Sequence, residues 1–222
     1  MQAPQPGFSQ MAVTFRRPAW MLALMGLCLA LLSACGEPGI WASDADVQAA
    51  RYAHDGAAEL TLVTIMHHRS GRGDHTALFI NGRERVIFDP AGSWERRVNP
   101  RRGDVHYGMS PEAGASFYLS HVRETHYAKV QRIAVPLEVA EQAKALALAE
   151  GAVGPARCAI STARILRQLP GFGGVGSSFF PQVLMRNFGQ IPGVQEYELH
   201  HDDPELEAMA RRAQAPLSAP QP

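Results

Sequence analysis

Residues 74–93 read DHTALFINGRERVIFDPAGS, and this stretch decides the fold class. Two runs rich in β-branched and aromatic residues, 75–80 and 85–89, flank Asn81-Gly82, a dipeptide typical of hairpin turns. A three-residue turn over 81–83 would pair His75 with Asp89 and leave the apolar residues on the other face: Leu78, Ile80, Val86 and Phe88. Because sheet faces segregate by polarity, we favour this register over a two-residue turn, which would direct His75 and Asp89 to opposite faces.

Outward from the hairpin, the sequence alternates apolar runs with turn residues. We expect further strands at 59–68, 115–120, 126–135 and 194–199, and helices at 136–151, from about 155 onward, and at 182–189. Residues 90–115 and the glycine-rich 170–182 read as loops. Because strands precede helices, the predicted class is α+β with an antiparallel sheet packed against a cysteine-bearing helix.

The N-terminus carries an export signal, RRPAWMLALMGLCLALLSAC at 16–35. Two arginines, a short apolar run and small residues are typical of a secretory signal peptide, and the run is short for a membrane span. LSAC at 32–35 resembles the bacterial lipobox, which implies cleavage before Cys35 and a diacylglycerol (palmitate-type) anchor on its sulfur. An uncleaved N-terminal anchor is the alternative, and translation could start at Met1 or Met11.

The signal sets the expected organisation and address of the chain. We predict a signal peptide at 1–34, a tether at 35–58, one domain at 59–202 and a disordered tail at 203–222. Gly36 is not the aspartate used for inner-membrane retention, so we expect an outer-membrane lipoprotein facing the periplasm. The formal charge falls from 0 to −2 when Arg16 and Arg17 leave with the signal, which argues against a nucleic-acid partner.

Cys158 is the one cysteine beyond residue 35. Cys28 leaves with the signal and Cys35 carries the lipid, so Cys158 has no disulfide partner in an oxidising compartment. Gly154-Pro155 would start a helix with Cys158 in its first turn, where the helix dipole favours a thiolate. Cys158 also recurs at helical spacing with Ile165 and Leu169, which is typical of a buried stripe. Both a core thiol and a nucleophile fit this pattern.

The hairpin supplies the groups that a nucleophilic thiol needs. A neutral imidazole at His75 can take the thiol proton, and the carboxylate of Asp89 can fix the tautomer and orientation of the ring. His68 and His126 remain alternatives to Asp89 as the third polar group. We expect no metal and no cofactor.

This order of motifs resembles the circularly permuted papain-like families, which are related to NlpC-type cell-wall amidases and to lecithin retinol acyltransferase. The resemblance covers roughly residues 60–170 and rests on HTALFI, FDPAGS and RCAISTARIL, with the histidine strand before the cysteine helix. It implies Cys158 as nucleophile, His75 as base, Asp89 as orienting residue and an oxyanion hole at the Cys158 backbone N–H. Arg157 stands where related permuted families often carry asparagine.

These expectations leave more than one function class open. The first is an envelope-anchored thiol hydrolase that acts through an acyl-enzyme, on amide bonds of peptidoglycan peptides. The alternatives are an acyl-lipid hydrolase or acyltransferase, and a papain-like lipoprotein that binds an envelope partner without catalysis.

Overall fold

A seven-stranded antiparallel sheet organises residues 40–214, the part of the chain that this computed structural model describes. The predicted signal peptide, Cys35 and both possible start residues lie outside the described residues. The strand order is β4-β5-β3-β2-β1-β6-β7. The strands are β1 Glu59–His67, β2 Gly73–Asn81, β3 Arg85–Phe88, β4 Arg101–Arg102, β5 Val105–His106, β6 His126–Ala134 and β7 Gln195–Leu199.

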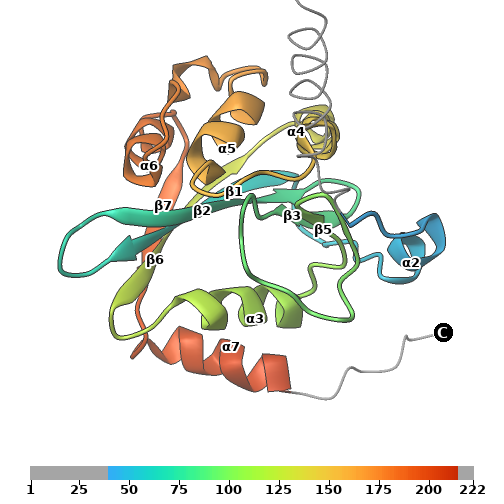
Figure 1. Cartoon of the computed structure of the whole chain (residues 1–222), viewed down its shortest axis with the longest axis horizontal. Coiled ribbons are helices and arrows are strands. Elements are labelled where there is room, and N and C mark those ends of the chain that lie inside the picture. The colour runs from blue at the N-terminus through green and yellow to red at the C-terminus, as the bar shows by residue number, and fades with distance from the viewer. Residues whose placement is uncertain (1–39, 215–222) are drawn as a thin grey trace, which may run out of the picture. The chain divides into compact units, whose positions relative to one another are not determined.

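Helices cover both faces of the sheet (Figure 1). One face carries α4 Leu137–Glu150, α5 Cys158–Leu166 and α6 Pro181–Gly189, with the short 3-10 helix Gly173–Val175 between the last two. The other face carries α3 Pro111–His121 and α7 Pro204–Gln214. A short helix, α2 Asp44–Ala49, precedes the first strand. The described residues therefore have the predicted α+β class with an antiparallel sheet.

The β2–β3 hairpin has the predicted faces with a different register. Asn81 pairs with Arg85, so the turn comprises residues 82–84 instead of 81–83. The amide of Arg83 donates to the Glu141 carboxylate on α4 at 2.8 Å, which holds the turn in this position. The four apolar residues named above all pack against α4 and α5, as predicted.

The shift of two residues preserves the faces but changes which residues oppose each other. The last β2–β3 pair is Leu78 with Phe88, so Asp89 lies past the end of β3 and is not the ladder partner of His75. The predicted direct pairing of these two residues is therefore wrong. Residues 73–77 of β2 have no β3 partner, so this part of the β2 edge is free to meet another element.

A β-bulge in the β1–β2 ladder lies immediately before His75. Ile65 pairs with His75, but the next residue, Met66, pairs with Gly73, so Asp74 is the extra residue. Bulges bend the strand and redirect neighbouring side chains, and they are common beside active sites.

Residues 115–120, predicted as a strand, belong to α3. Ser110 caps this helix by accepting from the Ala113 amide, and Pro111 occupies its first turn. A Ser-Pro start outweighs the β-forming tendency of Phe117 and Tyr118, because both signals favour helix initiation. The predicted loop 90–115 likewise contains β4 and β5 and contributes buried residues, including Trp94 and Met109.

Both ends of the domain extend further than composition suggests. Residues 204–214, expected in a disordered tail, form α7, which buries Leu206 against the α3 side of the sheet. Residues 40–58, expected as a tether, are hydrogen-bonded to the domain: Ala58 O accepts from the Val135 amide and Tyr52 O from the Arg85 amide. Single apolar residues within these polar segments, Val47, Ala58 and Leu206, also pack against the core of the domain. Among residues 40–214, every helix falls short of the length and apolarity needed to traverse a bilayer.

Candidate functional site

The N-terminus of α5 carries Cys158 as its first residue. The helix begins three residues later than expected, because Ala156 has a left-handed backbone with φ of 59° and interrupts the path from Pro155. Cys158 is unpaired and only 6% exposed, so its sulfur faces the interior of the molecule. The backbone N–H of a first helical residue has no intrahelical acceptor, so it is available to a ligand.

The thiol of Cys158 meets the free edge of β2. Burial alone would raise the pKa of this thiol, but a hydrogen bond with His75 and the backbone N–H groups of Thr76 and Ala159 outweigh it and lower the pKa. The Thr76 amide lies on the part of β2 that β3 leaves unpaired. Three donors therefore favour the thiolate form, which is the nucleophilic form of cysteine.

His75 lies between the thiol and a carboxylate. Its Nε2–H donates to Asp89 Oδ1 at 2.6 Å, which leaves Nδ1 for Cys158. Burial alone would lower the pKa of His75, but the hydrogen bonds with Asp89 and Cys158 raise it to about 9. At neutral pH the His75 ring is therefore protonated, and a protonated ring beside Cys158 favours the thiolate form of the cysteine.

Asp89 is almost fully buried, at 2% exposure. Burial alone would raise the pKa of this carboxyl, but the bond from His75, with weaker contributions from the His121 and His106 rings, holds it below its usual value. Gly92 packs directly on the carboxylate: a Cβ at this position would lie 2.0 Å from Asp89 Oδ2. The glycine therefore leaves room for Asp89 where any other residue would displace it.

A second histidine, His121, stacks on His75, and the sequence motifs did not indicate it as a residue of the site. The two rings are 5.5 Å apart with an interplanar angle of 10°. His121 ends α3 and donates Nδ1–H to the Phe117 carbonyl at 2.8 Å. Burial lowers the pKa of His121, so this ring is neutral beside the charged His75. Because 115–120 was expected to be a strand, the helical i,i+4 relation of Phe117 and His121 was missed.

Asp104 joins the two loops that carry the site. Its Oδ2 accepts from the Ala91 amide at 3.0 Å and from the Val153 amide at 2.9 Å. Ala91 follows Asp89, and Val153 precedes Cys158. Ala91 and Ala156 are the two non-glycine residues with positive φ in the described part of the chain, and one lies in each loop. Left-handed backbone at a non-glycine residue costs free energy and persists where the surroundings hold it.

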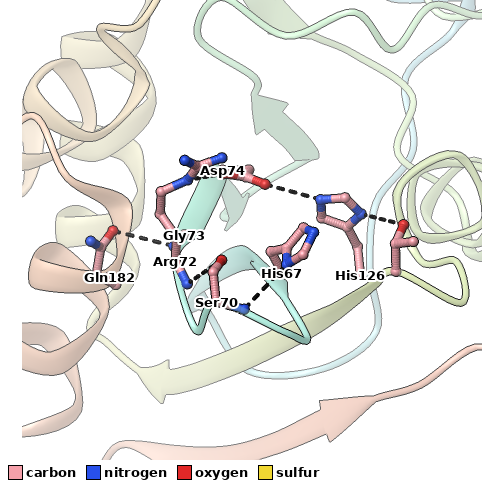
Figure 2. A network of polar contacts seen from close by, with 8 residues as sticks. His67, Ser70, Arg72, Gly73, Asp74, His126 and Gln182 are labelled. Carbon is pink, nitrogen blue, oxygen red and sulfur yellow. Dashed lines mark hydrogen bonds and ion pairs between the residues drawn. The ribbon is translucent and has the colours of Figure 1, made fainter.

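The two alternative third residues lie elsewhere. His68 stacks with Tyr127 and His200, whose ring centroids are 4.9 and 5.3 Å away. His126 is close in space to the bulge, but its Nε2 bonds Asp74 Oδ2 at 3.0 Å (Figure 2). Of the three residues considered, only Asp89 contacts His75.

The polar network of Figure 2 holds the start of β2. Asp74 accepts from Arg72 Nε at 2.8 Å as well as contacting His126, so the extra residue of the bulge is held from both sides. The Gly73 amide donates to Gln182 Oε1 at 3.3 Å, which attaches the strand to α6. A Cβ on Gly73 would approach Pro181 and the Gln182 amide to 2.8 Å. The network therefore fixes the strand that presents His75.

Within residues 40–214, no three His, Cys, Asp or Glu side chains are grouped as a metal ion would require. The site thus consists of a thiol, a base and a carboxylate held at the meeting point of a helix and a strand edge. Comparisons of the chain with protein-family models, with curated proteins and with solved structures find no match.

Proposed function

We propose that this chain is an envelope-anchored thiol hydrolase that acts through an acyl-enzyme. The observation that carries the proposal is the contact of Cys158 with His75, whose other ring nitrogen bonds the buried Asp89 at 2.6 Å. A core cysteine would have aliphatic neighbours and a raised pKa, whereas this thiol has three donors and a lowered pKa.

The roles follow from the positions of the groups. The Cys158 thiolate attacks a substrate carbonyl carbon, and the carbonyl oxygen becomes an oxyanion facing the Cys158 backbone N–H. The His75 imidazolium then donates its Nδ1 proton to the leaving amine or alcohol, and a thioester remains on Cys158. His75 next accepts a proton from water, whose oxygen attacks the thioester and releases a carboxylic acid and the Cys158 thiolate, with His75 again protonated. Asp89 keeps the ring in the required tautomer throughout.

The order of these groups along the chain supports a permuted papain-like architecture. The histidine strand β2 precedes the cysteine helix α5, and α5 packs against the sheet with Ala159 and Ala163 buried against it. This is the order implied by the resemblance of the sequence motifs, and the resemblance of residues 32–35 to a lipobox supports a place in the envelope. Amide bonds of peptidoglycan peptides are the substrate class we propose.

An acyl-lipid substrate is the second candidate, and one surface feature favours it. Phe179 and Phe180 are 56% and 60% exposed just before α6, the helix attached to the start of β2. Exposed neighbouring aromatic side chains are suited to contact an apolar chain. In this version the same thiol attacks an ester and the thioester is passed to water or to an alcohol.

Two measurements test the proposal and separate the candidates. An electrophilic thiol probe should label Cys158 in the folded protein at pH 6, and His75→Ala should reduce the labelling while the protein stays folded. Digests of muropeptides and of phospholipids then identify the bond cleaved, with Cys158→Ser as the blank. Labelling only after unfolding, together with no product from either substrate, would favour the binding lipoprotein.

A further inference from the structure

A cavity lies at the β4–β5 edge of the sheet, away from the Cys158 site. Its volume is about 420 Å³, and its walls come from residues 40–42, the loop 95–101 and His106. Neither Cys158 nor His75 lines it, so the mechanism above does not use it.

Arginines dominate the charge of this cavity. Arg96, Arg97 and Arg101 line it together with one acid, Glu95, which pairs with Arg101 at 3.1 Å. Within the described residues, Arg96 and Arg97 have no ion-pair partner. The cavity therefore carries two uncompensated positive charges.

The nearby acids of α2 do not neutralise these arginines. Asp44 pairs with Arg102, and Asp46 lines an adjoining hollow with Arg97 without forming an ion pair with it in the described residues.

One buried side chain of the cavity also has no partner. His106 is 2% exposed, yet its Nδ1 makes no hydrogen bond within the described residues. Burial lowers the pKa of this ring, so it brings no positive charge to the wall of the cavity. The two free guanidinium groups suit the oxygens of a phosphodiester.

The rim of the cavity is apolar and exposed. Ile40 is 56% exposed, Trp41 is 61% and Val98 is 50%, which makes three of the six large apolar side chains exposed in the described region. Trp41 also lies against the Arg102 guanidinium, 5.5 Å from the ring centroid. Tryptophan with arginine is typical of protein surfaces at the membrane interface.

Chain length places this surface near the anchor. Ile40 is five positions after Cys35, and an extended chain spans at most about 3.6 Å per position, or about 18 Å in total. If Cys35 is lipidated, the rim is therefore held within about 18 Å of the bilayer interface by covalent connection.

We propose that this surface docks onto the membrane, with Trp41, Ile40 and Val98 at the interface and the phosphate of an anionic phospholipid in the arginine cavity. The proposal rests on the lipid anchor of the proposed function but not on the chemistry at Cys158. It gives the domain a fixed orientation on the bilayer, where a flexible tether would give none.

Tryptophan fluorescence tests the docking directly. The full chain, produced in a bacterium that processes lipoproteins, carries Trp20→Phe, so that exposed Trp41 and buried Trp94 are the emitters. It is reconstituted into discs of brominated phosphatidylcholine, with or without one third phosphatidylglycerol. Subtracting the emission of the Trp41→Phe version isolates Trp41.

We expect stronger quenching of Trp41 in the anionic discs. Each arginine near an anionic surface favours the docked state about fivefold, so Arg96→Gln with Arg97→Gln should weaken docking about 25-fold and restore the emission. The matched pair Arg69→Gln with Arg167→Gln removes the same charge from exposed positions outside the cavity and should leave the quenching unchanged. High salt should act like the first pair.

Each failure has a separate signature. Mass spectrometry and flotation report the lipid on Cys35; if it is absent, quenching of the same chain mixed with vesicles still reports the surface. The docking proposal is overturned if Trp41 is unquenched, or if quenching is equal in both discs and insensitive to the arginine pair. Loss of quenching with inorganic phosphate at constant ionic strength would support the proposal, because the free anion would then displace the lipid phosphate from the cavity.

Discussion

The two faces of the sheet contribute different halves of the candidate site. The α4–α5–α6 face supplies the helix that carries Cys158, while the α3–α7 face supplies His121, which stacks on His75. The halves meet at residues 73–77, where β2 extends beyond β3. Cys158 from one face and His121 from the other both contact His75 at this open edge, so the site depends on both helical layers.

The largest expected effect concerns the helix half alone. Cys158→Ser should reduce turnover more than about 1,000-fold, because a hydroxyl is far harder to deprotonate than a thiol. The side chains are nearly isosteric, so the melting temperature should change little. Steady-state rates with thermal unfolding check both statements, and residual activity within tenfold of the wild type would exclude Cys158 as nucleophile.

We expect buried side chains on the two faces to contribute comparably to the free energy of unfolding. Phe117 on α3 and Leu166 on α5 are fully buried. Phe117→Ala should lower the free energy of unfolding by about 3–5 kcal/mol and Leu166→Ala by about 2–5 kcal/mol. Urea unfolding provides both values. A loss below 1 kcal/mol for Phe117→Ala would show that the α3 layer is a peripheral cover.

Asp104→Asn tests the connection between the two loops of the site. The amide retains one acceptor but loses the charge that holds the Ala91 and Val153 amides, each such bond being worth about 1.5–3 kcal/mol. We expect about a tenfold lower kcat with a smaller change in KM, because Cys158 and Asp89 lose their relative position. Asp202→Asn, at an exposed position, is the control. Equal effects of both variants would refute the positioning role.

The smallest effects are in the pH dependence. His75 has a pKa raised to about 9, above its unfolded value of 6.5, so its stabilising contribution is complete below 6.5 and lost as pH rises through about 9. Activity should fall over the same upper range, because the leaving group then lacks a proton donor.

His121→Gln sharpens this last measurement. Removing the stacked ring should move the upper limb of the pH profile by less than about one unit while leaving the limb set by Cys158 in place. A pH-rate profile of substrate turnover checks both limbs. A profile identical to that of the wild type would show that His121 is structural only.

The same division explains what could be predicted from sequence. The strands 59–67 and 126–134 and the helix 137–150 have long, regular patterns, so their predicted bounds lie within two residues of the observed ones. The helix α3 was missed because its aromatic residues suggested a strand and its Ser-Pro start was not recognised. Because α3 was not predicted, the placement of His121 beside His75 could not be predicted either.

Within the site, chemistry could be predicted but geometry could not. The residue types and order indicated Cys158, His75 and Asp89, and the structure brings these three together. The turn position depends on the Glu141 contact from a distant helix, so the hairpin alone could not determine it. The bulge at Asp74 and the hydrogen bonds that Asp104 accepts are likewise made by residues far apart in sequence.

The two hydrogen bonds accepted by Asp104 also bear on the order in which the parts of the site are synthesised. Its two partners, Ala91 and Val153, are 62 positions apart in the chain (153 − 91), and the second is 49 residues beyond Asp104. At about 5–20 residues per second, a growing chain carries the acid–base half for about 2–10 s before Val153 is added. Cys158 follows Val153 by five residues. Of Cys158, His75 and Asp89, the cysteine is thus the last to be synthesised, five residues after the final partner of Asp104.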